Sequence, residues 1–311
     1  MHLTLSLRIL GLLLTLFSSA MLPPLLIAVL ADDETVTGFI SAFAITLASG
    51  LALWLPLRGR ARELHIRDGF LITALFWTVL GLFGSLPLAL TDSLHISVTD
   101  AIFESISGLT TTGATVLTGL DHMPPSILLY RQMLQWLGGI GIIVVAVAVL
   151  PMLGIGGMQL YRAETPGPTK DSKLTPRITE TAKVLFTVYL TLTVLCALAY
   201  AAAGMSGFDA VCHAFATVAI GGFSTHDASM GYFDSNTIYL ISSFFMLIAA
   251  LNIGLHYTAF HRRSLSGYFE DSEARFFAGA MAVCAGITCL YLIVTKTLPA
   301  GDSLVHGFFQ A

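Results

Sequence analysis

Charged side chains are scarce in this sequence of 311 residues. Lys, Arg, Asp and Glu together make up 11% of it, whereas 55% of the residues are hydrophobic and the mean hydropathy is +0.81. A soluble domain carries about 25% charged residues, which it needs to cover its surface. The shortage of charge therefore excludes a soluble globular protein and indicates an integral membrane protein.

Cysteine is also sparse, and its positions do not suit the common cysteine motifs. No two of the four cysteines form a CxxC pair, and all lie in apolar or amphipathic segments: Cys196, Cys212, Cys284 and Cys289. We interpret them as small buried residues and not as a disulfide or a metal site.

Glycine clusters occur at 138, 139 and 141 and again at 154, 156 and 157. A nucleotide-binding loop would need a preceding strand, which the sequence lacks at this point, and the first cluster lies in an apolar run. We therefore expect these glycines to allow close packing of helices.

Long apolar runs are what the sequence has in abundance. The first resembles a signal peptide but continues to about Leu30 without a small-residue cleavage site, so we expect a membrane helix. Pro23 and Pro24 predict a kink in it. Seven runs exceed the roughly 20 residues that a membrane helix needs, at 7–30, 36–56, 69–90, 127–151, 182–203, 235–260 and 276–298.

Positive and negative charges occupy different connections between these runs. All but two of the 15 Lys and Arg residues fall near the N-terminus or around residues 58–67, 162–183 and 262–275. The positive-inside rule places these parts, and with them the N-terminus, in the cytoplasm. We interpret the two exceptions, Arg131 and Lys296, as side chains near helix ends that snorkel to the interface. The other connections are acidic, with Asp32, Asp33, Glu34, Asp92, Asp121, Asp227 and Asp234.

Two stretches between the long runs are too short to cross a bilayer and resemble each other. Residues 100–115 read DAIFESISGLTTTGAT, and residues 209–224 read DAVCHAFATVAIGGFS. A third copy begins at residue 302 with DSLVHGFFQA. When the copies are aligned on their first Asp, Gly113 coincides with Gly222, and a titratable residue recurs at one offset as Glu104, His213 and His306.

The charge pattern is consistent only if residues 100–115 and 209–224 enter and leave the membrane on the outer side, because a full crossing would move the basic connections outside. Each stretch is therefore predicted to be a re-entrant pore helix followed by a backbone-lined segment, with Asp100, Asp209 and Asp302 as N-caps.

The predicted fold is an all-α polytopic membrane protein of parallel helix–re-entrant pore helix–helix repeats around a pseudo-fourfold pore axis. We expect the chain to be truncated in the third repeat and to be a fragment of a longer protein. The predicted units are an N-terminal transmembrane hairpin with a cytoplasmic loop (1–68), a first helix–pore–helix unit (69–160), a cytoplasmic loop (161–181), a second unit (182–262) and an incomplete third unit (263–311).

The residue types after each pore helix suit the transfer of a cation. Bare backbone at membrane depth is tolerated only where protein buries it or where it lines water. A dehydrated cation needs oxygen ligands, which backbone carbonyls supply when glycine relieves the strain of turning them inward. The predicted ion filter comprises Thr110, Thr111, Thr112, Gly113, Ala114, Ile220, Gly221, Gly222, Phe223 and Ser224, and potassium is expected on the carbonyls of Thr111, Thr112, Ile220 and Gly221.

The titratable residue of each pore helix has two interpretations. It tunes the electric field at the filter, because ionisable groups within the membrane are costly and often functional. Alternatively, it forms a hydrogen bond that holds the pore helix in place, which we favour because buried polar groups are normally satisfied.

Four motifs together resemble the bacterial TrkH type of potassium-translocating subunit of the Trk/Ktr/HKT superfamily. They are SISGLTTTGAT (105–115), QWLGGIGIIVVAVAVLP (135–151), ETPGPTKDSKLTPRI (164–178) and FATVAIGGFST (215–225). The resemblance implies a non-enzymatic potassium transport protein of the bacterial inner membrane, with four filters around one pore and no organic cofactor. It also implies a homodimer in membrane lipid that binds a TrkA-like cytoplasmic nucleotide-binding regulatory subunit and no nucleic acid.

In this family a glycine at the filter position goes with potassium selectivity, so Gly113 and Gly222 imply potassium over sodium. Two other functions stay open on the residues alone. One is a permease for sodium or for mixed monovalent cations. The other is a membrane scaffold or intramembrane enzyme whose Gly- and Thr-rich loops only pack.

Overall fold

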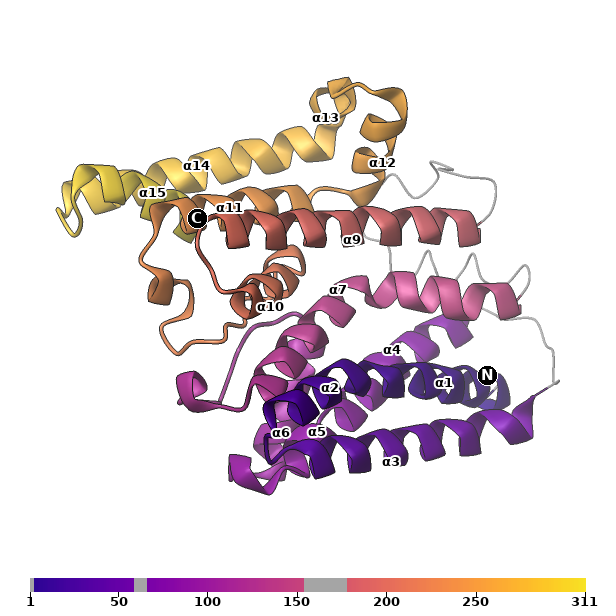
Figure 1. Ribbon diagram of the computed structural model, residues 1–311. Coiled ribbons are helices and arrows are strands. Elements are labelled where there is room, and N and C mark those ends of the chain that lie inside the picture. The colour runs from indigo at the N-terminus through magenta and orange to yellow at the C-terminus, as the bar shows by residue number, and fades with distance from the viewer. Residues whose placement is uncertain (1–2, 59–65, 154–177) are drawn as a thin grey trace.

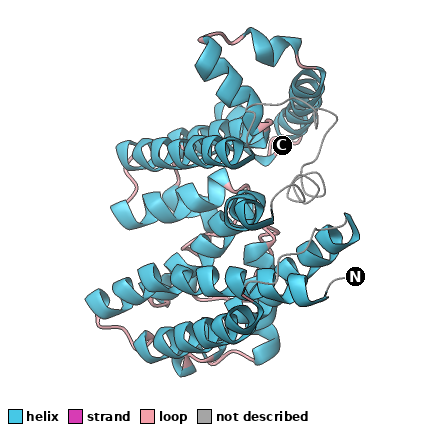
Figure 2. Cartoon of the chain, turned by 90° about the vertical axis from the view of Figure 1, so that its right-hand side faces the viewer, coloured by secondary structure: helices cyan, strands magenta, loops and turns pink. Residues whose placement is uncertain are grey.

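The computed structural model describes residues 3–58, 66–153 and 178–311, and the regular elements in these ranges are all helical (Figures 1 and 2). Several sequence predictions concern residues outside these ranges. They are the basic residues Arg60, Arg62, Arg162, Lys170, Lys173 and Arg177, the second glycine cluster at 154–157 and most of the loop at 161–181.

The chain begins with a hairpin of two long helical segments. α1 (Leu3–Ser18) leads through a 3-10 turn (Ser19–Met21) into α2 (Leu22–Ala31), and α3 (Val36–Trp54) returns along α1. The break lies directly before Pro23 and Pro24, whose rings lack an N–H and clash with the carbonyls four residues earlier. The regular α-helical turns are thus interrupted, which agrees with the expectation that the prolines kink or loosen this helix, while Thr4–Ala31 still forms one apolar span.

The rest of the described chain alternates long helices with short ones. The first group contains α4 (Ile66–Gly84), α5 (Leu86–Ala89), α6 (Val98–Leu109) and α7 (Pro125–Leu153). The second contains α9 (Ile178–Ala202), α10 (Gly207–Val218), α11 (Asn236–Ala250) and α12 (Ile253–Arg262). The last contains α13 (Ser266–Glu270), α14 (Ser272–Val294) and α15 (Ala300–Gln310).

Within the described residues, five segments are long and apolar enough to cross a membrane, which makes the protein a multi-pass membrane protein. They are Thr4–Ala31, Val36–Leu57, Leu71–Ala89, Lys183–Ala202 and Ser272–Val294. The apolar run at 235–260 is not one continuous helix, because α11 and α12 meet at an angle of 94°, and the two helices pass the length and hydropathy test for a span only together. Leu251 is extended there, and the side chain of Asn252 caps α12 by accepting a hydrogen bond from the Gly254 N–H at 2.9 Å.

The short helices start three residues earlier than predicted. Ser97 is the N-cap of α6 and accepts a hydrogen bond from the Asp100 N–H, while the Asp100 carboxylate accepts one from the Ser97 N–H. Ser206 caps α10 in the same way through the Asp209 N–H. The aspartates therefore lie at the third helical position and are not N-caps, because the serine three residues before each one takes that role.

The long helices run side by side and share two ends (Figure 1). The ends of α3 and α7 and the starts of α4 and α9 lie at the right of the view, whereas the connections around α5, α6 and α10 lie at the left. Each segment that contains α6 or α10 thus enters and leaves the bundle at the same end.

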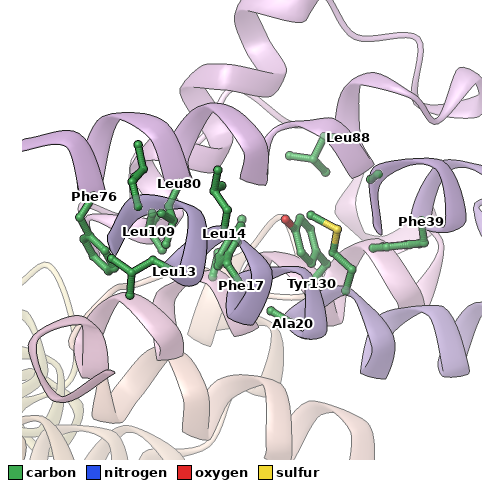
Figure 3. Packing of buried hydrophobic residues seen from close by; sticks show 14 of the residues in the cluster. Leu13, Leu14, Phe17, Ala20, Phe39, Phe76, Leu80, Leu88, Leu109 and Tyr130 are labelled. Carbon is green, nitrogen blue, oxygen red and sulfur yellow. The ribbon is translucent and has the colours of Figure 1, made fainter. Parts of the chain in front are cut away.

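A hydrophobic cluster holds the hairpin against α4, α6 and α7 (Figure 3). Leu14 and Phe17 of α1 point towards Tyr130 of α7, beside Leu80 of α4 and Leu109 of α6. The Tyr130 hydroxyl donates a hydrogen bond to the carbonyl of Gly84 at 2.7 Å. This packing fixes the first turns of α7 relative to α6. It therefore also fixes the position of Arg131, which follows Tyr130 in the chain.

The first glycine cluster allows α7 to approach its neighbours closely, as predicted. A Cβ at Gly138 would overlap the carbonyl oxygen of Leu109, the last residue of α6. A Cβ at Gly139 would lie 3.2 Å from the Cβ of Ala219, which follows α10. The cysteines are less uniform than expected, because Cys196 and Cys212 are buried but Cys284 is exposed.

Substitution of Gly138 by Ala should destabilise the packing of α7 on α6. The new methyl group would meet backbone atoms, which cannot rotate away, so we expect a loss of about 1–3 kcal/mol of the free energy of unfolding. Thermal unfolding of the purified protein in detergent measures this loss. Gly207→Ala is the matched control, because no atom lies within 4 Å of the added Cβ. Equal unfolding temperatures for both variants would contradict the assignment.

Candidate functional site

Two strained segments follow the short helices. The first segment (residues 110–115) follows α6, and the second segment (residues 219–224) follows α10. φ is 54° at Thr111 and 78° at Gly113, and it is 53° at Ile220 and 82° at Gly222. The two segments therefore share the same pair of left-handed residues at the same offsets.

Left-handed backbone is unusual for the β-branched residues Thr111 and Ile220. Such a conformation costs on the order of 1–3 kcal/mol per residue and persists only where the surroundings impose it, which happens most often at functional sites. Glycine at 113 and 222 removes the strain at the second left-handed position of each segment. Because the same strained backbone conformation occurs in both segments, we interpret it as functional and not as an incidental loop shape.

The two segments are in contact although they come from different helix groups. A Cβ at Gly113 would overlap the carbonyl oxygen of Gly221 and would lie 3.6 Å from the Cα of Gly222. The position of a Cβ at Gly222 is open, with no atom within 4 Å. The structure therefore brings together the two glycine-centred segments that the sequence paired.

Hydrogen bonds hold the first segment to α6. The Thr112 N–H donates to the carbonyl of Ser107 at 2.9 Å, and the Ser107 hydroxyl donates to the carbonyl of Ala114 at 2.6 Å. The hydroxyls of Thr110 and Thr112 are 2.8 Å apart and bond to each other. The segment is thus fixed from the helix that precedes it.

Gln135 of α7 holds the second segment. Its side-chain amide donates to the carbonyl of Gly221 at 2.7 Å and accepts from the Phe223 N–H at 3.1 Å, so it spans Gly222 from both sides. Gln135 is buried. The sequence analysis assigns no role to Gln135. The only sign of such a partner is that the backbone groups on either side of Gly222 lie outside a helix and need hydrogen bonds from elsewhere.

Glu104 and His213, which occupy equivalent positions in α6 and α10, make equivalent contacts. The Thr115 hydroxyl lies 2.9 and 3.0 Å from the two carboxylate oxygens of Glu104. The Ser224 hydroxyl is hydrogen-bonded to Nε2 of His213 at 3.0 Å. Each titratable residue therefore holds the far end of its own segment, in accord with the second of the two interpretations. His306 of α15 instead lies against the ring of Tyr239, with centroids 4.7 Å apart.

Arg131 joins the two segments. It is fully buried, and its Nε donates to Oε1 of Glu104 at 2.7 Å. Nη2 donates to the Thr115 hydroxyl and Nη1 donates to the carbonyl of Ser224, both at 3.1 Å. The guanidinium carbon lies 4.4 Å from the ring centre of Phe223.

The prediction that Arg131 snorkels to the interface is therefore wrong. A charged side chain that is 0% exposed must be paired, and Glu104, also 0% exposed, is its partner. The signal was present in the sequence, since ionisable residues inside membrane segments usually pair with one another. The partner of Arg131 could not be predicted, because the spacing along the chain does not show which helix lies beside α7.

The loops that follow the two segments are also linked. His226 is hydrogen-bonded to Asp121 at 2.6 Å and lies 3.4 Å from Oδ1 of Asp209. The Gly119 N–H donates to Asp227 at 2.9 Å. The hydrogen bond with His226 lowers the pKa of Asp121 below its ordinary value of 3.8. Among the described residues no group of three or more His, Cys, Asp or Glu side chains forms a metal site.

These bonds satisfy only some of the backbone groups of the paired segments. Thr110, Thr112, Ile220 and Gly222 are exposed. Within the described part of the chain, no hydrogen bond reaches the carbonyl oxygens of Thr111, Thr112 or Ile220, while the carbonyls of Ala114, Gly221 and Ser224 accept side-chain donors. Carbonyl oxygens without internal partners are available to an outside ligand.

Comparison with known proteins gives consistent results. The family model described as "TrkH: Cation transport protein" matches residues 36–311. The Trk system potassium uptake protein TrkH of Halomonas elongata is 59% identical over 310 residues, and that of Escherichia coli K12 is 56% identical over 314. The crystal structure of the potassium transporter TrkH from Vibrio parahaemolyticus matches with a TM-score of 0.87 at 50% identity. The matches to these two relatives and to the crystal structure cover 100% of this chain, which spans 64% of the length of each of those proteins.

Gln135→Leu should lower the free energy of unfolding by about 1–3 kcal/mol, because the buried carbonyl of Gly221 and the N–H of Phe223 lose their partner. Chemical or thermal denaturation in detergent measures the loss. Gln132→Leu is the matched control, since Gln132 is equally buried on the same helix but its amide has no hydrogen-bond partner among the described residues. The same loss in both variants would exclude the hydrogen bonds as its cause.

Asp121→Asn should lower the Tm at neutral pH, and the difference from the unaltered protein should shrink in acid. Because the folded-state pKa is lowered, the carboxylate contributes stability above 3.8 and loses it as the pH falls through the lower folded-state value. Tm values between about pH 7 and about pH 3 test this dependence. Asp92→Asn, at an exposed position, is the control. A difference that does not change with pH would contradict the role of the carboxylate.

Proposed function

This chain belongs to the TrkH family of cation transport proteins, and we propose that it forms part of a potassium-uptake protein whose ion path is lined by its two strained segments. The family is one of transporters and not of enzymes. The proposed filter contains Thr110 to Ala114 and Ile220 to Ser224.

The observation that carries the proposal is the contact between two left-handed segments in which several backbone carbonyls have no internal partner. Gly113 packs on Gly221, and the bonds from Gln135 and Arg131 come from α7. Among the described residues the carbonyl oxygens of Thr111, Thr112 and Ile220 accept no hydrogen bond, as a carbonyl cage for a dehydrated cation requires. A loop that only packed would be expected to satisfy those oxygens within the protein.

The proposed potassium ligands are backbone carbonyls of Thr111, Thr112, Ile220 and Gly221. The carbonyl of Gly221 already accepts a hydrogen bond from Gln135, so its share in ion binding is the smallest of the four. The first three have no such bond among the described residues. Potassium is the transported ion in this proposal and not a resident cofactor.

Two further features favour a cation at this place. α6 ends at Leu109 and α10 ends at Val218, so the negative ends of both helix dipoles adjoin the segments. Asp121 and Asp227 lie in the connections at the same end of the bundle, where negative charge raises the local concentration of cations.

The proposal extends to the assembly. The relatives are named for a Trk system and for potassium uptake. We propose that the protein lies in a bacterial inner membrane with its N-terminus in the cytoplasm and works as a homodimer with four filter segments around each pore. A TrkA-like nucleotide-binding subunit would gate it, with residues 164–183 as the proposed contact.

Gly222→Ser tests the ion path. The Cβ has room, so the substitution adds only the strain of a left-handed residue at the proposed filter. We expect the ratio of potassium to sodium uptake by the full-length protein to fall at least about tenfold, the factor that corresponds to about 1.4 kcal/mol of lost discrimination. Uptake is measured in cells without other potassium transporters and in liposomes.

Gly204→Ser is the matched control for this test. Gly204 is also left-handed, with a φ of 103° and no atom near its Cβ position, but it follows α9 outside the segments. Its ratio should equal that of the unaltered protein. An unchanged ratio in Gly222→Ser would contradict the proposed filter. Sodium uptake equal to potassium uptake in the unaltered protein would favour a mixed permease, and no uptake would favour a scaffold.

A further inference from the structure

We propose that Arg131 is a positioning residue for ion selectivity, a brace that sets the distance between the two filter segments. This inference rests on the proposed function. It assigns the residue a role beyond neutralising a buried carboxylate.

The contacts of Arg131 divide between the two segments. On one side, Nε and Nη2 reach Glu104 and the hydroxyl of Thr115. On the other side, Nη1 reaches the carbonyl of Ser224, and the guanidinium plane lies against Phe223. Thr115 and Ser224 occupy the same offset in the two copies. One rigid group therefore joins equivalent points at the far ends of both segments.

Glu104 allows this cation to sit beside an ion path. An unpaired buried guanidinium would repel potassium and would itself be unstable. The pair is closed at 2.7 Å, with both side chains 0% exposed. Oε2 of Glu104 also accepts the N–H of Val116 at 3.2 Å. Glu104 thus neutralises the positive charge of Arg131, and the hydrogen bonds of the guanidinium to both segments remain.

The guanidinium is suited to this task and an ammonium is not. It presents its donors in a fixed planar fork, whereas lysine offers a single nitrogen on a flexible chain. A lysine at 131 would keep the ion pair with Glu104. It would not reach Thr115 and Ser224 from separate atoms at the same time. Arg131→Lys therefore separates the charge of the residue from its bracing role.

The spacing of the carbonyl ligands matters for discrimination between potassium and sodium, because the cage must replace the hydration shell of one ion better than that of the other. Gly113 and Gly221 touch in the middle of the segments, and Arg131 joins their ends. These are two separate restraints on the distance between the two segments. Loss of the outer one should affect selectivity more than it affects folding.

The test compares Arg131→Lys, Gln132→Leu and the unaltered full-length protein, each purified and reconstituted in liposomes. The measured quantities are the Tm in detergent and the ratio of radioactive rubidium uptake to radioactive sodium uptake. For Arg131→Lys we expect a folded protein whose ratio falls at least about tenfold, a loss that corresponds to about 1.4 kcal/mol. Gln132→Leu, altered at the neighbouring buried residue, should keep the ratio.

A second variant covers the case in which Arg131→Lys does not fold. Thr115→Val preserves the shape of the side chain but removes the hydroxyl that Nη2 contacts, and it leaves the ion pair intact. Its ratio should also fall, and Thr115→Ser, which retains the hydroxyl, should restore it. An unchanged ratio in Thr115→Val would overturn the inference even without the arginine variant.

The outcomes separate the two proposals. If the unaltered protein does not prefer rubidium to sodium, the proposed function fails and the inference falls with it. If the unaltered protein is selective and Arg131→Lys is equally selective, only the inference is overturned. A fall of the same size in Gln132→Leu would likewise overturn it, because the effect would then belong to any change in this part of α7.

Discussion

The cost of leaving polar groups unsatisfied inside a membrane is the constraint on which this structure depends. The hydrocarbon of the bilayer offers no hydrogen-bond partners, so irregular backbone and buried charge persist at that depth only where protein groups satisfy them or where they line a water-filled path. Here α6 and α10 each bond to the segment that follows them, and α7 bonds to both segments. Gln135 bonds to the second segment, and Arg131 bonds to both segments through Thr115 and Ser224. The carbonyl oxygens that these bonds leave free are those on which we place the ion.

This arrangement explains the order of the elements. The hydrophobic cluster around Tyr130 fixes the start of α7 against α1, α4 and α6 (Figure 3). Gly138 and Gly139 then let the same helix touch the residues that end α6 and follow α10. Packing thus delivers one rigid helix to two strained segments, and the strain at Thr111 and Ile220 is tolerated because neighbouring bonds impose it.

Much of this could be predicted from the sequence where the signal is local or repeated. Composition indicated a membrane protein, and the repeat paired Gly113 with Gly222, whose segments are in contact in the structure. Predictions failed where the partner was distant in the chain. The sequence predicts an interfacial position for Arg131, because nothing along α7 shows that Glu104 lies against it. The N-caps were misplaced because Ser97 and Ser206 precede the repeated part of the motif, and the bend at Leu251 has no proline to announce it.

The central claim is that the carbonyls of the two segments bind the transported ion. Its most direct test is the anomalous scattering of rubidium in crystals of the full-length protein grown in rubidium salt. We predict a rubidium peak within coordination distance of the carbonyl oxygens of Thr111, Thr112 and Ile220. Rubidium bound elsewhere, with these oxygens turned to lipid or bonded within the protein, would contradict the account.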